Sequence, residues 1–308
     1  MSGLSLTVFA ALAVSALTGS VASSSAHDNL PPLRHGYVDN RYGQLHFSIA
    51  TPARRSDLPP LVLFHQSPNS SEEFHDLVRM LGRERIAIAI DTPGYGGSDG
   101  PATIPSIEDY AGAIAEGLRH LGYGRQRPVD VFGYHTGSKI VTELALAEPG
   151  MIRRVILSGL YDPPPAQLAQ ALANLHHPSS VSDLLERFYE RLPQTRDYYA
   201  KQGLSEEQWG RIRIDSLRSL TRQEFGHEAA FRYAPQFATR LALIQQPVLL
   251  LPLDDGLAQA TRDAAPRFRI VRVASETLGA GGFFTQTEAI AAVMNQFSRE
   301  AALSQGSK

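Results

Sequence analysis

The sequence of 308 residues contains no cysteine. Without thiols the chain forms no disulfide bond, has no thiolate metal ligand and has no cysteine nucleophile. It also lacks an excess of either charge, because 29 Lys and Arg residues stand against 31 Asp and Glu residues. No cluster of Lys or Arg stands out. We therefore expect no binding to nucleic acid, which requires a concentrated basic surface.

The N-terminal region is apolar and lacks a basic residue. Leu4–Leu17 has the length of the hydrophobic part of a signal peptide and is short for a membrane span. Ser24–Ala26 then supplies the small residues of a cleavage site. We expect residues 1–26 to be a signal peptide, the mature chain to be exported (periplasmic or secreted), and no stable membrane anchor. The missing basic residue leaves a disordered start as the alternative.

Apolar runs alternate with helical patterns in two parts of the chain. The alternating segments 35–39 and 44–49 predict a hairpin. Helical periodicity occupies 72–82 and 106–121, and the second of these starts with the capping-box pattern Ser106–Asp109. Buried strands are predicted at 61–64, 86–90, 129–132, 155–157, 248–251 and 268–273. This alternation predicts an α/β fold with a mostly parallel, eight-stranded sheet and helices on both faces.

The alternation is interrupted between residues 161 and 240. This segment has helical patterns, no strand-like run, and the only tryptophan of the chain, Trp209. An all-helical insertion after a core strand is typical of a lid over a binding site, with a plain helical extension as the alternative. We therefore assign 27–160 and 241–302 to an α/β core and 161–240 to a helical cap.

The stretch Gly133–Gly137 reads Gly-Tyr-His-Thr-Gly, follows an apolar run and precedes a helical pattern. Strand, Gly-x-nucleophile-x-Gly and helix in this order form a nucleophile elbow, whose central residue is normally serine. The central residue here is His135. Both glycines are expected because a Cβ at either position would crowd the turn.

Five segments, in this order, resemble the α/β-hydrolase superfamily from about Gly36 to Phe297. They are Leu63–Asn69 after the third strand, Asp91–Asp99 after the fourth, the elbow, the acid-bearing turn Leu251–Gly256, and the late turn Gly279–Phe284. The resemblance implies a hydrolase without a cofactor. Its substrate would be a small ester- or carbonyl-containing molecule bound between sheet and cap.

Two departures from the family pattern affect catalysis. His135 replaces the serine, and Gly281 stands where the family usually has its catalytic histidine. No histidine follows His227. Elbows with Gly-x-His-Thr-Gly are a minority variant of this superfamily, and the relatives that carry them mostly keep the late histidine. This chain therefore lacks both the usual nucleophile and the usual base.

The remaining parts of a hydrolase site do not depend on serine. By resemblance, the backbone N–H groups of Gln66 and Thr136 are the oxyanion donors. At a helix N-terminus His135 is favoured as a neutral imidazole, which can act as general base or nucleophile. Asp255 or its neighbour Asp254 would orient it. A relic in an inactive site is the alternative role for His135.

Two further residues are expected near the elbow. His65 ends the third strand, between the strands that end at His135 and Asp91, and these three side chains would suffice for a catalytic zinc. In this fold, however, the histidine at that turn usually bonds backbone and the aspartate anchors its own turn, so we expect no metal. Tyr134 either lines the pocket or packs.

Three functions follow from these residues. The first is a hydrolase with His135 as atypical base or nucleophile. The second is a non-catalytic pseudo-hydrolase that binds a small ligand, and the third is a lyase that uses the same pocket. Glu276 on the late loop is a further candidate base.

Overall fold

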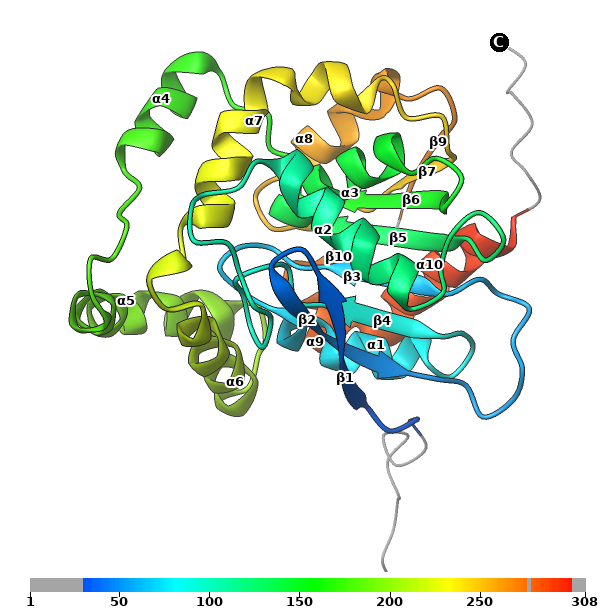
Figure 1. Ribbon diagram of the computed structural model, residues 1–308, viewed down its shortest axis with the longest axis horizontal. Coiled ribbons are helices and arrows are strands. Elements are labelled where there is room, and N and C mark those ends of the chain that lie inside the picture. The colour runs from blue at the N-terminus through cyan, green and yellow to red at the C-terminus, as the bar shows by residue number, and fades with distance from the viewer. Residues whose placement is uncertain (1–29, 276–277, 301–308) are drawn as a thin grey trace, which may run out of the picture. The chain divides into compact units, whose positions relative to one another are not determined.

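Eight strands build the central sheet of the computed structural model, which describes residues 30–275 and 278–300. They are β1 (Arg34–Asn40), β2 (Gly43–Ala50), β3 (Leu61–Phe64), β4 (Ala87–Ile90), β5 (Val129–Tyr134), β6 (Ile152–Ser158), β7 (Val248–Leu250) and β9 (Val271–Val273). Their spatial order is β1-β2-β4-β3-β5-β6-β7-β9 (Figure 1). β2 is antiparallel to β1 and β4, and all other neighbours are parallel. The predicted sheet is confirmed.

Side chains of each buried strand alternate between the two faces of the sheet, as the pleat requires. In β3, for example, Leu63 packs in one hydrophobic cluster and Phe64 in the other. Each cluster is completed by helices, so the prediction of helices on both faces is confirmed. The Phe64 side is covered by α2 (Ile107–His120) and α3 (Thr136–Ala147), and the Leu63 side by α1 (His75–Leu81) and α10 (Thr287–Arg299).

Two elements differ in extent from their sequence patterns. The predicted helix 72–82 is divided, because the 3₁₀ turn η2 (Ser71–Phe74) precedes α1. The predicted strand 268–273 is reduced to β9, because residues 269–270, which follow the 3₁₀ turn η4 (Ala265–Arg267), form a bend. Neither change alters the strand order.

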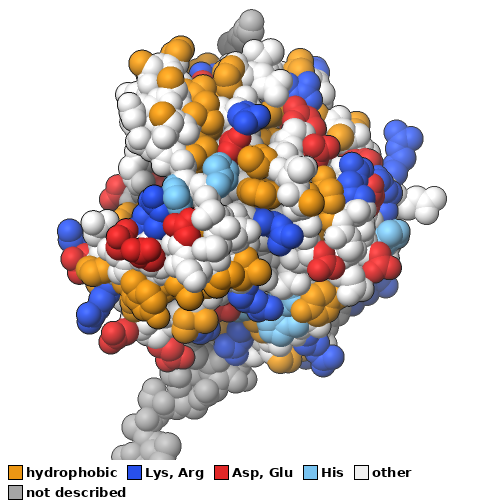
Figure 2. Space-filling view, turned by 60° about the vertical axis from the view of Figure 1, so that its left-hand side comes forward, with side chains coloured by type: hydrophobic (Ala, Val, Ile, Leu, Met, Phe, Trp, Pro, Cys, Tyr) orange, Lys and Arg blue, Asp and Glu red, His pale blue; other side chains and the backbone are white. Residues whose placement is uncertain are grey.

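The segment between β6 and β7 is helical. Its elements are α4 (Pro165–Ala173), α5 (Val181–Lys201), α6 (Glu206–Ser216), the 3₁₀ turn η3 (Leu217–Arg222) and α7 (Phe225–Leu241). Helix α7 is tied to α3 by an ion pair between Arg240 Nη2 and Glu143 Oε2, 2.5 Å apart. The other helices lie to the left of the sheet in Figure 1. Figure 2 brings that side forward and shows hydrophobic side chains interspersed with acidic and basic ones.

The predicted signal peptide, residues 1–26, lies outside the described residues. Among the residues that the structure describes, no helix combines the length and the apolar character needed to cross a membrane.

The sheet is joined to α10 through the buried carboxylate of Asp130 in β5. Asp130 Oδ2 accepts from Arg85 Nη2 at 2.7 Å and from Ser298 Oγ at 2.7 Å, and Oδ1 accepts from Arg153 Nε at 2.8 Å. Arg85 and Asp130 are both fully buried. A buried charge is tolerated only with such partners, so removing one partner leaves the other uncompensated.

We expect Asp130→Asn to lower the free energy of unfolding by about 3–5 kcal/mol, because two arginines lose their shared counter-ion. Urea denaturation measures this change. The control is Asp57→Asn at an exposed position, for which we expect a change within about 0.5 kcal/mol. Equal stability of the two variants would contradict a structural role for the network.

Candidate active site

His135 occupies the strained turn between β5 and α3. Its backbone has φ 48° and ψ −110°, in the positive-φ region that residues other than glycine seldom adopt. Its N–H donates to Ser158 O at 3.1 Å, and its carbonyl accepts from the Ser138 hydroxyl at 2.6 Å. These bonds hold the residue on the turn and leave the imidazole 27% exposed.

Three glycines make room for this turn. A Cβ at Gly133 would collide with the carbonyl of Gly137, and a Cβ at Gly137 would collide with the carbonyl of Phe64 in β3. Gly159, which follows β6 with φ +64°, would place a Cβ against the His135 ring. The sequence predicted the first two constraints. The third was missed, because only the fold brings Gly159 next to His135.

The imidazole of His135 hydrogen-bonds a buried carboxylate. Its Nε2 lies 2.9 Å from Asp255 Oδ2, and Asp255 Oδ1 accepts the Leu257 N–H at 2.8 Å. The Asp255 side chain is only 1% exposed. An ionised carboxylate only accepts hydrogen bonds, so Nε2 carries the proton and Nδ1 keeps its lone pair. Of the two acids considered from sequence, the structure brings Asp255 to His135.

Burial alone would raise the pKa of the Asp255 carboxyl. The hydrogen bond and charge of His135, together with the Leu257 N–H, outweigh burial and lower this pKa overall. Asp255 is therefore ionised at neutral pH and can stabilise an imidazolium at His135. Asp254, in contrast, is exposed in the short strand β8 (Leu253–Asp254).

Tyr134 packs beneath the elbow. Its ring centroid lies 5.0 Å from that of Phe283 and 4.3 Å from that of His135. Burial and the negative charge of Asp255 raise the pKa of Tyr134 well above its ordinary value, so the hydroxyl stays protonated and bonds Asp255. Of the two roles considered for Tyr134, the structure shows packing, and the side chain does not line the cavity.

The place of the missing late histidine is occupied by the cap. Gly281 precedes the short helix α9 (Gly282–Thr285). A Cβ at Gly281 would collide with the carbonyl of Gln202 at the end of α5 and lie 2.9 Å from Leu204 Cδ1. The late loop therefore has no room for an imidazole at this position. Glu276, the other base considered, lies outside the described residues.

His65 is buried and bonded on both ring nitrogens. Its Nδ1–H donates to Gln66 O at 2.8 Å, and its Nε2 accepts the Thr92 N–H at 3.0 Å. Burial lowers the pKa of His65. Asp91 accepts the N–H groups of Ser71 and Gly97, both at 2.7 Å. These bonds match the backbone-anchoring alternative, and within the described ranges no three His, Asp or Glu side chains are arranged to hold a metal.

The expected oxyanion donors have different surroundings. Thr136 is the first residue of α3, so its N–H has no acceptor within the helix. The Gln66 N–H points to Glu73 Oε2 at 3.4 Å, while Glu73 Oε1 accepts Gln66 Nε2 at 2.5 Å and Asn69 Nδ2 at 3.1 Å. Glu73 was missed from sequence. The sequence feature that could have identified Glu73 is its position seven residues after Gln66, a polar residue where the family has glycine.

Burial raises the pKa of Glu73 to about 7, although hydrogen bonds from Gln66 and Asn69 oppose this shift. The neutral carboxyl competes less strongly than the carboxylate for the Gln66 N–H.

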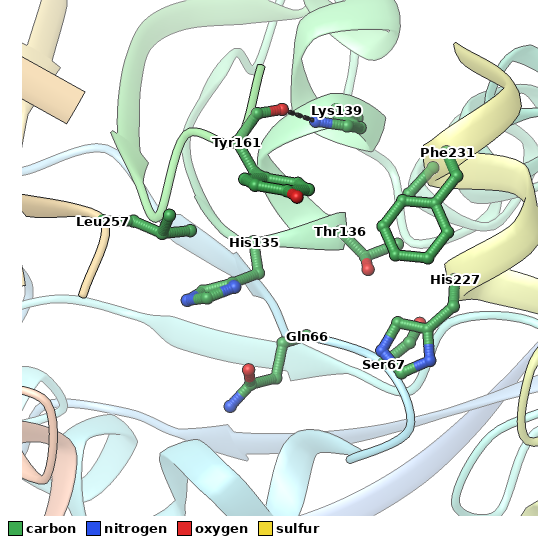
Figure 3. A pocket seen from close by; sticks show the side chains of 10 residues that line it. Gln66, Ser67, His135, Thr136, Lys139, Tyr161, His227, Phe231 and Leu257 are labelled. Atoms are coloured by element: carbon green, nitrogen blue, oxygen red, sulfur yellow. Dashed lines mark hydrogen bonds between the residues drawn. The ribbon is translucent and has the colours of Figure 1, made fainter. Parts of the chain in front are cut away.

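A cavity of about 340 Å³ lies between the elbow and the cap helix α7 (Figure 3). His227 of α7 lies across it from His135, and its Nδ1 is 2.7 Å from Glu224 Oε2. Sequence reasoning missed the cap residues, because their packing is not readable from the sequence. The signal for His227 was its spacing of three residues from Glu224 on one helix. The lining residues are Gln66, Ser67, His135, Thr136, Lys139, Tyr161, His227, Ala230, Phe231 and Leu257.

The fold matches known proteins. Residues 59–205 match the family model described as alpha/beta hydrolase fold. The enol-lactonase from Burkholderia xenovorans superposes with a TM-score of 0.68 at 18% identity, covering 86% of this chain and 100% of that chain. The chain has the α/β-hydrolase fold.

Two curated hydrolases are similar over shorter segments. The (E)-2-((N-methylformamido)methylene)succinate hydrolase of Acinetobacter baylyi is 28% identical over 103 residues, which are 33% of this chain and 38% of that protein. The soluble epoxide hydrolase of a Corynebacterium species is 30% identical over 98 residues, 32% of this chain and 33% of that protein. The chain thus matches little more than a third of each relative's length.

We expect Glu73 to make stability depend on pH. The pKa of Glu73 is about 7 in the native state, against an ordinary value of 4.5. Between pH 4.5 and pH 7 the native state therefore binds more protons than the unfolded state. The stability that it contributes therefore falls as pH rises through this window, by up to ~3 kcal/mol. Glu73→Gln removes this dependence.

Urea denaturation at pH 5 and pH 8 tests this expectation. The free energy of unfolding of Glu73→Gln, relative to that of the wild type, should be higher at pH 8 than at pH 5. For Glu186→Gln, at an exposed position, this difference should be the same at both pH values. A wild-type-to-Glu73→Gln difference that is the same at both pH values would rule out the shifted carboxyl.

Proposed function

We propose that this chain is a hydrolase of small ester- or carbonyl-containing molecules in which His135 is the general base. The observation that carries the proposal is the 2.9 Å hydrogen bond between His135 and buried Asp255, beside a cavity that His135 and helix α7 both line. The matches to an enol-lactonase, a succinate-type hydrolase and an epoxide hydrolase support hydrolysis as the reaction class.

The proposed reaction begins with water bound next to His135. Nδ1 takes a proton from this water, and the water oxygen attacks the carbonyl carbon of the substrate. The resulting imidazolium is stabilised by the carboxylate of Asp255. We favour water activation over direct attack by His135, because Nδ1 is the ring nitrogen closer to the strained backbone.

The tetrahedral intermediate carries a negative oxygen. The N–H of Thr136 stabilises it, joined by the N–H of Gln66 when Glu73 is protonated. When the intermediate collapses, the bond to the leaving oxygen breaks and that oxygen takes a proton. His227, which lines the opposite side of the cavity, donates this proton in its protonated form. Afterwards His135 releases to solvent the proton that it took from water, and His227 takes up one proton from solvent, so both side chains return to their starting states. These steps use only protein groups and water.

We expect His135→Ala to lower kcat/KM for short esters, lactones and thioesters by about 10²–10⁴-fold, measured on the best substrate. Asp255→Asn should lose about 10²-fold or more, because the amide favours the wrong tautomer. A chromogenic or pH-stat assay on such a panel measures both.

The matched control is Asp254→Asn, one residue away and exposed, which should retain activity. Turnover that survives His135→Ala, or equal losses in Asp254→Asn and Asp255→Asn, would sink the proposed mechanism. Wild-type protein that binds but never turns over any member of the panel would instead favour the pseudo-hydrolase or lyase alternatives.

We expect His227→Gln to slow poor leaving groups more than good ones. An alkoxide leaving group requires a proton as it departs, whereas a nitrophenolate does not. The kcat of alkyl esters should therefore fall by about 10²-fold, with a much smaller change for nitrophenyl esters. His177→Gln serves as the control, since His177 pairs with Glu228 at 2.6 Å and does not line the cavity. A loss that is the same for both ester types would argue against proton donation by His227.

A further inference from the structure

Lys139 is a buried cation in the wall of the candidate active site. It lies in the first turn of α3, four residues after His135, and is 3% exposed. Residues four apart on a helix share a face, which explains why both line the same cavity. Figure 3 shows the side chain above the cavity, with its amine bonded to the Tyr161 carbonyl.

Among residues 30–275 and 278–300, this amine has no anionic partner at contact distance. Nζ donates to Tyr161 O at 2.8 Å and lies 3.8 Å from the centroid of the Phe237 ring. Among the described residues, none of the ion pairs includes Lys139, and Asp162 raises its pKa only through space. Glu143, one turn further along α3, is bonded to Arg240 and Tyr233.

A buried ammonium without a counter-ion is costly. Burial accordingly lowers the pKa of Lys139 to about 7, although the charge of Asp162 opposes this shift. One carbonyl and one aromatic face leave part of the three-proton donor capacity of the ammonium unused. An anion that enters the cavity would supply both the missing charge and the missing acceptor.

We propose that Lys139 binds a carboxylate of the substrate, so that the natural substrates are small esters, lactones or amides that carry a free carboxylate. This inference rests on the proposed function, because it places the substrate in the cavity of His135. Bound in this way, the carboxylate would anchor the molecule one helical turn from His135 and orient its reactive carbonyl toward the elbow. Lys139 would be a specificity residue that contacts the substrate without taking part in bond breaking.

The pH dependence of binding follows from the groups around the amine. The elements that surround it carry Asp162, His135, His227, the Glu143–Arg240 pair with Tyr233, and the Glu228–Arg232 pair. Glu73, which bonds Gln66 in the same cavity wall, also titrates near pH 7. Substrate carboxylates are ionised well below pH 7, whereas Lys139 gains its proton as pH falls toward 7. Carboxylate binding should therefore tighten as pH falls from 8.5 to 6, with uptake of a proton.

The test compares monomethyl glutarate, which has one carboxylate, with dimethyl glutarate, its neutral counterpart. Calorimetry in the His135→Ala background measures binding without turnover. The monoester should bind more tightly than the diester. Lys139→Met should weaken monoester binding by about tenfold or more and reduce its pH dependence to the part that Glu73 contributes, while leaving diester binding unchanged. Lys139→Arg should retain the preference for the monoester, which separates loss of charge from loss of folding.

Several results would overturn the proposal. One is equal binding of the two esters, and another is no detectable binding of the monoester at millimolar concentration. A third is unchanged binding of the monoester by the Lys139→Met variant, when circular dichroism shows that this variant is folded. An adduct of Lys139 with 4-oxopentanoate that borohydride traps by reducing an imine would show that the amine attacks carbonyl groups. This result would also overturn the proposal.

The two proposals fail separately. Carboxylate-selective binding by His135→Ala, with no turnover of either ester by the wild type, would refute the hydrolase and keep the role of Lys139. Turnover that depends on His135 but shows no preference for the monoester would keep the hydrolase proposal and refute the role of Lys139.

Discussion

The hydrogen bond between His135 and Asp255 is the interaction on which the site depends. Asp255 is buried on the turn that follows β7, where this fold places its acid, and a buried carboxylate needs a partner. The late loop has no imidazole to offer. The elbow residue itself fills that role, and in doing so it brings base and orienting acid into direct contact. In the proposed reaction a site of three side chains is reduced to two, and water replaces the serine hydroxyl as nucleophile.

The cap completes what the core leaves open. The core supplies His135, Thr136 and Gln66, while α7 supplies His227 and Phe231 on the far side of the cavity. Two histidine–carboxylate pairs thus face one space, one on the rigid elbow and one on the cap. Lys139 in the wall of this space, and Glu73 behind the wall residue Gln66, have pKa values near 7, so small changes in pH alter the charge in and around the cavity.

Much of the fold could be predicted from the sequence, because it is encoded in short-range patterns. Buried strands read as apolar runs, and the start of α2 reads as the capping box that Ser106 and Asp109 form. The elbow could be placed to the residue, since its glycines have a steric reason that the structure bears out. The choice between Asp254 and Asp255 could not be made, because adjacent residues differ in direction only once the backbone is known.

The part of the cavity wall that Lys139 and α7 form was beyond prediction for a related reason. Lys139 and His227 are 88 residues apart in sequence and meet only through the packing of α7 on α3. Sequence patterns report which face of a helix is apolar, and they do not report which helix that face will meet.

The contact between Gly281 and Gln202 also bears on how this site relates to those built on serine. A histidine at position 281 would not fit the present backbone, because its Cβ would collide with the Gln202 carbonyl at the end of α5. A serine at position 135 alone would leave Asp255 buried without its imidazole. The residues at positions 135 and 281 and the position of the end of α5 therefore depend on one another. A change to the serine–histidine chemistry would require the end of α5 to move as well as both residues to change.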